Sequence, residues 1–161
     1  MARATPSRIL VADDEADIVE IYRQVLTPAP PAVGNLAELE AELFGSAPVE
    51  AQSHMDFDIE IVRQGDQAVE AVRTAIADGA PFSVAFLDVR MPPGISGVEA
   101  ARRIREIDGQ ISIVFVTGYS DIPLSDIRRI VPPPDRMFYL QKPVQPPEVQ
   151  QMASALCARD A

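Results

Sequence analysis

The run at residues 84–87, four consecutive apolar residues followed directly by Asp88, constrains the fold of this chain more than any other stretch. Turn-forming residues bound it, with Gly-Ala-Pro at residues 79–81 and Pro-Pro-Gly at residues 92–94. A short apolar run between turns is typical of a strand that is buried on both faces, as in a parallel sheet. Because ligands of open α/β sheets bind at the carboxyl ends of the strands, we expect Asp88 to lie where the chemistry takes place.

Four further segments have strand character, and helical patterns separate them. The predicted strands span residues 8–12, 57–62, 84–88, 111–116 and 136–141. After each of them, apolar residues recur at the spacing of one helix face. Parallel strands need right-handed crossover connections, so this alternation predicts an α/β fold with one doubly wound parallel sheet and helices on both faces. The 161 residues are enough for one domain with a single core.

We expect a single domain over residues 1–161, with an insertion at residues 27–56. The insertion lies between the first predicted helix and the second predicted strand. The segment begins with prolines and contains a short amphipathic helix pattern with Leu36, Leu39 and Leu43 on one stripe. Two interpretations stay open. The stripe packs on the domain itself, or it contacts a partner domain or a second copy of the chain. In both cases we expect the segment to emerge on the side away from Asp88.

The composition excludes several classes of function. A net charge of −10 disfavours direct binding to nucleic acid. The single cysteine, Cys157, rules out a disulfide framework within the chain and fits a reducing cytoplasm. The single histidine, His54, has no Cys or His cluster around it, so zinc chemistry has no support. No apolar run approaches membrane-spanning length, and the first residues lack the apolar core of a signal peptide, so we expect a cytoplasmic protein.

Polar residues follow the apolar part of four predicted strands, which end at the same edge of the sheet. These residues are Asp13 with Asp14, Asp88, Thr117 and Lys142. Each has an ordinary explanation taken alone. The acidic pair could cap the next helix, Asp88 could be a turn residue, Thr117 a loop hydroxyl and Lys142 a surface lysine.

Together these residues favour a cation site. Two carboxylates about 4 Å apart repel by roughly 4 kcal/mol at an effective dielectric near 20, so clustered carboxylates need cations or raised pKa values. Lys142 supplies one charge, and a hard divalent ion such as Mg²⁺ would supply the rest. A carboxylate beside Mg²⁺, a lysine and a hydroxyl suits phosphoryl transfer, with the carboxylate as the nucleophile.

Four motifs resemble the signature of bacterial response-regulator receiver domains, the phosphoacceptor domains of two-component systems. They are Val-Ala-Asp-Asp-Glu at residues 11–15, Leu-Asp-Val-Arg-Met-Pro at 87–92, Val-Thr-Gly at 116–118 and Gln-Lys-Pro at 141–143. The resemblance extends over residues 7–158 except for the insertion. It implies a flavodoxin-like five-stranded sheet with strand order 2-1-3-4-5.

The resemblance also implies residue roles. Asp88 would be the phosphoacceptor. Asp14 would bind Mg²⁺ directly, Asp13 chiefly through water, and the backbone carbonyl of Arg90 would be a further ligand. Thr117 would donate to a phosphoryl oxygen and Lys142 would pair with another.

Two further expectations rest on the same resemblance. Tyr139 matches an aromatic residue that changes rotamer as the threonine moves, although an ordinary half-buried strand aromatic explains it equally well. The Lys142–Pro143 peptide bond is expected to be cis. The loop at residues 91–97 is one residue longer than is usual in the family, and because the extra residue follows Arg90 we expect the metal ligands to be unaffected.

The favoured function is therefore a phosphoacceptor that takes a phosphoryl group from a histidine kinase or phosphotransfer protein and switches conformation to control an output. It would not be an enzyme beyond assisting its own phosphotransfer and autodephosphorylation.

The alternative is a pseudo-receiver, a non-phosphorylated protein-interaction module, and the complete set of acidic, Thr and Lys residues argues against it. A Mg²⁺-dependent phosphatase would need an acid–base residue that the sequence does not offer. An output domain in the same longer chain and a homodimer both remain open, and we expect no membrane or direct nucleic-acid partner.

Overall fold

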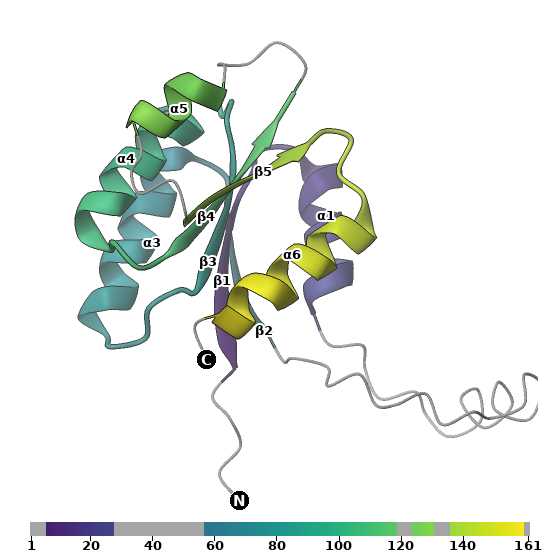
Figure 1. Ribbon diagram of the computed structural model, residues 1–161, viewed down its shortest axis with the longest axis horizontal. Coiled ribbons are helices and arrows are strands. Elements are labelled where there is room, and N and C mark those ends of the chain that lie inside the picture. The colour runs from purple at the N-terminus through teal and green to yellow at the C-terminus, as the bar shows by residue number, and fades with distance from the viewer. Residues whose placement is uncertain (1–5, 28–56, 119–123, 131–135, 160–161) are drawn as a thin grey trace, which may run out of the picture.

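The computed structural model describes residues 6–27, 57–118, 124–130 and 136–159. In these ranges it contains one five-stranded sheet, in which every neighbouring pair of strands is parallel and the order is β2-β1-β3-β4-β5 (Figure 1). The predicted fold class and strand order are confirmed. The strands are β1 (Ser7–Ala12), β2 (Phe57–Val62), β3 (Val84–Asp88), β4 (Ser112–Thr117) and β5 (Met137–Gln141).

Helices cover both faces of the sheet (Figure 1). They are α1 (Ala16–Leu26), α3 (Gly65–Ala77), α4 (Gly97–Ile107), α5 (Leu124–Ile130) and α6 (Pro146–Arg159). Helices α1 and α6 pack on one face, and α3, α4 and α5 lie on the other. No helix in the described part of the chain is long and apolar enough to cross a membrane.

Strand β3 lies at the centre of the sheet, between β1 and β4, and all five of its residues are buried. Val84 and Phe86 pack into the core under α1 and α6, whereas Ala85 and Leu87 pack into the core under α3 and α4. Burial on both faces is the reason that the apolar run in the sequence is uninterrupted.

Strand β2 lies at one edge of the sheet and has the alternating pattern expected there. Its residues Phe57, Ile59 and Ile61 are partly buried against the core beneath α1, while Asp58 and Glu60 are exposed. One face of this strand therefore remains in contact with solvent.

The residues that flank the insertion lie at the sheet edge opposite Asp88. Thr27 is the C-cap of α1, and Phe57 pairs with Ser7 at the first position of β1. Asp88, by contrast, is the last residue of β3. The expectation that the insertion leaves the domain on the side away from Asp88 agrees with the placement of its two ends, whereas Leu36, Leu39 and Leu43 lie outside the described residues.

Candidate functional site

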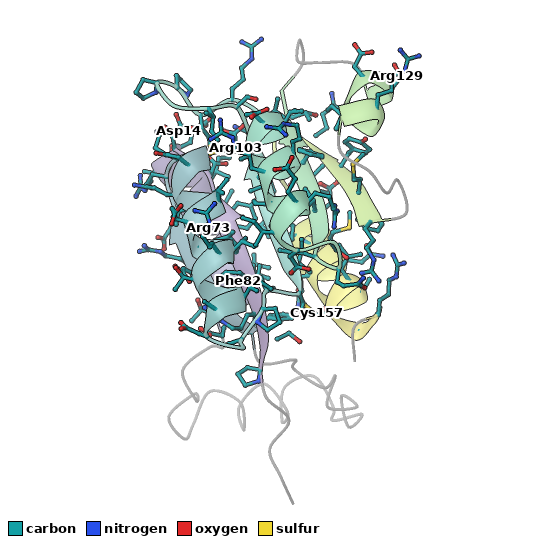
Figure 2. The ribbon with its side chains drawn as sticks, turned by 90° about the vertical axis from the view of Figure 1, so that its left-hand side faces the viewer. Asp14, Arg73, Phe82, Arg103, Arg129 and Cys157 are labelled. Atoms are coloured by element: carbon teal, nitrogen blue, oxygen red, sulfur yellow. The ribbon has the colours of Figure 1, made fainter. Side chains whose placement is uncertain are left out.

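The carboxyl ends of β1 and β3 bring the predicted acidic residues together. Figure 2 shows Asp14 at the opposite end of the molecule from Phe82, which precedes β3. Carboxylate oxygens of Asp13, Asp14, Glu15 and Asp88 all lie within 4.8 Å of one another. Glu15 is a member of this cluster to which the sequence assigned no role.

Asp88 is 3% exposed and both of its carboxylate oxygens have partners. Its Oδ1 accepts a hydrogen bond from the Arg90 backbone amide at 3.2 Å, and its Oδ2 accepts one from Lys142 Nζ at 3.1 Å. Burial raises the pKa of Asp88, and these two donors oppose the rise without cancelling it. The carboxylate is thus held in a fixed orientation by one ammonium and one main-chain amide.

Asp13 is the most deeply buried acid of the cluster, with 1% of its surface exposed. Its Oδ1 accepts a hydrogen bond from the Glu15 amide at 2.9 Å, but its buried Oδ2 has no hydrogen-bond partner among the residues that the structure describes. Burial, together with repulsion from Asp88, raises the pKa of Asp13 to about 7. A buried carboxylate oxygen without a donor, beside a second buried carboxylate, fits a hard cation such as Mg²⁺.

The ordinary explanation of Asp13 and Asp14 as helix caps is wrong. The N-cap of α1 is Glu15, and its side chain makes no capping hydrogen bond. Asp13 is still attached to the sheet, since its amide donates to the Val62 carbonyl at 3.2 Å. The chain therefore needs two more residues before it turns into the helix, and this leaves the acidic side chains available to the site.

Lys142 follows β5, the strand at the other edge of the sheet from β2, and its side chain reaches the acidic cluster. Its Nζ donates to Glu15 Oε1 at 2.7 Å as well as to Asp88 at 3.1 Å. Burial lowers the pKa of Lys142, but the two carboxylates outweigh burial and the net shift is upward, so the ammonium stays charged. The Lys142–Pro143 peptide bond is cis, as the resemblance predicted.

Thr117 and Tyr139, the two expected switch residues, lie on the neighbouring strands β4 and β5, and β4 also pairs with the strand that Asp88 ends. Thr117 is the last residue of β4 and half-buried, and its carbonyl accepts a hydrogen bond from the Lys142 amide at 2.9 Å. The ring of Tyr139 stacks on Phe115 with their centroids 6.0 Å apart. Its hydroxyl is buried and has no hydrogen-bond partner within the described part of the chain.

The loop that leaves Asp88 is closed by a glycine in direct contact with the backbone of Asp88. The Gly97 amide donates to the Val89 carbonyl at 2.9 Å. A Cβ atom at Gly97 would lie 2.0 Å from the Asp88 carbonyl oxygen, so only glycine fits without displacing the backbone. The sequence marked residue 97 only as a loop residue and did not predict this contact.

Comparisons with known proteins agree with this geometry. Residues 49–154, well over half of the chain, match the sequence model of the response regulator receiver domain, although this match does not include β1 and its acidic pair. The receiver protein CpdR of Brucella abortus is 36% identical over 78 residues, which cover 47% of this chain and 62% of CpdR. The response regulator TodT of Pseudomonas putida is 46% identical over 40 residues, which are 25% of this chain and only 17% of TodT.

Solved structures of low sequence identity share the fold. A CheY-like receiver domain protein from Methanospirillum hungatei has a TM-score of 0.63 at 18% identity and covers 98% of this chain and 100% of its own. TrrA from Thermotoga maritima, in complex with Mg²⁺ and BeF, has a TM-score of 0.59 at 23% identity and covers 93% of this chain and 98% of its own. With the family match and the observed strand order, the chain belongs to the response regulator receiver domain family.

Proposed function

We propose that this chain is the phosphoacceptor of a two-component phosphorelay, phosphorylated on Asp88 with Mg²⁺, and that phosphorylation switches its conformation to control an output. The observation that carries the proposal is the setting of the Asp88 carboxylate. It ends the central strand and accepts a hydrogen bond from Lys142 at 3.1 Å. It also lies beside a buried Asp13 oxygen that has no hydrogen-bond partner among the described residues. The nucleophile thus has the Lys142 ammonium on one side and carboxylate oxygens that suit a second cation on the other.

In the proposed reaction an Asp88 carboxylate oxygen attacks the phosphorus of a phosphohistidine on a kinase or phosphotransfer protein. The new O–P bond forms an acyl phosphate, the N–P bond breaks, and its electron pair stays on the imidazole nitrogen, which is then protonated. Lys142 stays charged and neutralises a phosphoryl oxygen. The Arg90 amide, bonded to the Asp88 carboxylate at 3.2 Å, fixes its orientation before attack.

The residues that would hold Mg²⁺ are Asp14, Asp13 chiefly through water, Asp88 and the backbone carbonyl of Arg90. When bound, the ion would neutralise charge on the phosphoryl oxygens. Oxygen ligands of this kind are those that Mg²⁺ prefers. Burial, with repulsion from Asp88, raises the pKa of Asp13, and this supports a cation beside it. Mg²⁺ is the cofactor proposed.

The switch would begin at Thr117, whose hydroxyl would donate to a phosphoryl oxygen, and continue through Tyr139. A phosphoryl group adds about −1.5 to −2 charges, which draw such donors toward it. In its present position the buried Tyr139 hydroxyl makes no hydrogen bond to any described residue. An unmade buried hydrogen bond costs about 1–3 kcal/mol, so a modest input is enough to favour another rotamer.

We propose a cytoplasmic setting and an output domain, in the same longer chain or in a separate partner. The net charge of −10 supports a protein partner in place of direct DNA contact. The same site would also assist hydrolysis of its own acyl phosphate.

The test is phosphoryl uptake from a small donor such as acetyl phosphate, measured by intact mass with Mg²⁺ or with EDTA. We expect one phosphoryl group with Mg²⁺, none with EDTA, and none in Asp88→Asn. Asp108→Asn is a matched control, because Asp108 is also a buried aspartate but follows α4 at the opposite edge of the sheet. No uptake in either the parent or this control would favour the pseudo-receiver alternative, and uptake in Asp88→Asn would refute the assignment.

A further inference from the structure

The loop between β3 and α4 is held by the side chain of Gln64, a residue of the β2–α3 turn. Gln64 is the N-cap of α3 with an extended backbone (φ −137°, ψ 153°), and its side chain makes no capping hydrogen bond to its own helix. Its Nε2 donates instead to the Pro92 carbonyl at 3.2 Å, and its Oε1 accepts from the Gly94 amide at 3.2 Å. Both ends of one side-chain amide are thus bonded to the main chain of the loop.

Two glycines make this contact close. A Cβ atom at Gly94 would lie 2.6 Å from Gln64 Oε1, so the glycine leaves the space that the amide oxygen occupies. A Cβ atom at Gly65 would lie 2.8 Å from Ile95 Cγ1 and 3.0 Å from the Ile95 carbonyl oxygen. The turn and the loop therefore touch at two successive positions, through the amide of Gln64 and through the backbone at Gly65.

The part of the loop between Asp88 and this contact contains Arg90, whose amide bonds Asp88 and whose carbonyl is a proposed Mg²⁺ ligand. The Arg90 amide donates to Asp88 Oδ1 at 3.2 Å, and the far end of the loop is closed by the bond from the Gly97 amide to the Val89 carbonyl. Between these fixed ends, the two hydrogen bonds of Gln64 hold the middle of the loop. This loop is also the one that is a residue longer than the family's usual spacing, so it has more main chain to order.

We propose that Gln64 is a positioning residue that orders this loop, so that the Arg90 amide stays bonded to Asp88 and the Arg90 carbonyl is held ready for Mg²⁺. The part of the proposal that concerns Mg²⁺ rests on the proposed function. A loop that is already ordered loses less conformational freedom when a ligand binds, so removing the two hydrogen bonds weakens binding. From the usual strength of such bonds we expect about threefold to tenfold weaker Mg²⁺ affinity.

The experiment compares Gln64→Ala and Gln64→Glu with the parent, and uses Gln150→Ala as a control because Gln150 is an exposed glutamine on α6. Three quantities are measured in each protein: amide hydrogen exchange at Gly94 and Arg90 without metal, the Mg²⁺ dissociation constant by titration calorimetry, and the melting temperature. In Gln64→Ala we expect faster exchange at both amides and the weaker Mg²⁺ affinity. Gln64→Glu keeps the acceptor for Gly94 and should lie between the alanine variant and the parent.

Two results would overturn the proposal. One is faster exchange at Gly94 alone, with Arg90 exchange and Mg²⁺ affinity as in the parent. The other is a lower melting temperature with unchanged Mg²⁺ affinity, which a purely structural role would give. A parent protein that binds no Mg²⁺ would count against the proposed function instead, and exchange at Arg90 would then decide by itself whether Gln64 positions the loop. If the alanine variant does not fold, Gln64→Glu carries the same comparison.

Discussion

Replacing Asp13 by asparagine is expected to stabilise the metal-free protein above neutral pH, although it removes a proposed metal ligand. Burial, with repulsion from Asp88, raises the pKa of Asp13 from its ordinary 3.8 to about 7 in the folded protein. The unfolded chain ionises near the ordinary value, so the folded state holds this proton more tightly. The stabilising contribution of that proton is fully present below about pH 4 and is lost as the pH rises to about 7.

The size of the effect follows from the pKa difference. A shift of roughly three units corresponds to about 4 kcal/mol, because each unit is about 1.4 kcal/mol. Asp13 is 1% exposed, so solvent screens little of the free-energy cost of ionising it in the folded protein. Because the site relaxes around the charge, about 4 kcal/mol is an upper value for this cost. Asparagine keeps an oxygen acceptor for the Glu15 amide and carries no charge. We therefore expect Asp13→Asn to be more stable than the parent by about 2–4 kcal/mol at pH 8 and nearly equal to it at pH 4.

Urea unfolding followed by circular dichroism at pH 4, 6 and 8, in EDTA, measures this difference. Added Mg²⁺ should stabilise the parent at pH 8 and have much less effect on Asp13→Asn, because the ion binds the folded state alone. An Asp13→Asn variant no more stable than the parent at pH 8 without metal would contradict the raised pKa of Asp13. So would a gain that is present at pH 4 to the same extent.

Three further changes test other parts of the structure. Gly97→Ala places a methyl group 2.0 Å from the Asp88 carbonyl oxygen and should lower the free energy of unfolding in urea by about 1–3 kcal/mol. Gly109→Ala is the control, because its Cβ meets nothing within 4 Å, and it should change the free energy of unfolding by less than about 0.5 kcal/mol. Glu15→Gln breaks an exposed ion pair with Lys142 and should cost less than about 1 kcal/mol while phosphoryl uptake persists; a larger loss would give this pair a structural role. Excision of residues 29–55 with a short polar bridge should leave Mg²⁺ binding and phosphorylation nearly intact by calorimetry and intact mass, and loss of phosphorylation in a folded protein would contradict the remote placement. If the leucine stripe is a partner contact, sedimentation should also show a changed oligomeric state.

The sequence predicted the architecture because burial leaves a simple pattern. Residues of β3 face two cores in turn, so the strand is apolar throughout, whereas β2 lies at an edge and alternates. Parallel connections then place every strand's carboxyl end at one edge, which is how Asp88 and Lys142 could be placed together although 54 positions separate them. Periodicity and turn residues were sufficient for the doubly wound parallel sheet, whereas the strand order was predicted from the resemblance to receiver domains.

The contacts of half-exposed polar side chains could not be predicted in the same way. The ion pair between Glu15 and Lys142 joins residues 127 positions apart, and it depends on side-chain rotamers that no period encodes. Gln64 stands directly before helix α3, yet its side chain bonds the main chain of a different loop. Likewise Asp13 is not a cap, because its amide still pairs with β2.

The most direct test of the account is to locate the phosphoryl group itself. The protein would be phosphorylated with acetyl phosphate and Mg²⁺, the acyl phosphate reduced with borohydride, and the modified residue identified by peptide sequencing in a mass spectrometer. We expect reduction at Asp88 alone, where the carboxylate ends β3 and accepts a hydrogen bond from Lys142 at 3.1 Å. Reduction at Asp13 or Asp14 in place of Asp88 would contradict it.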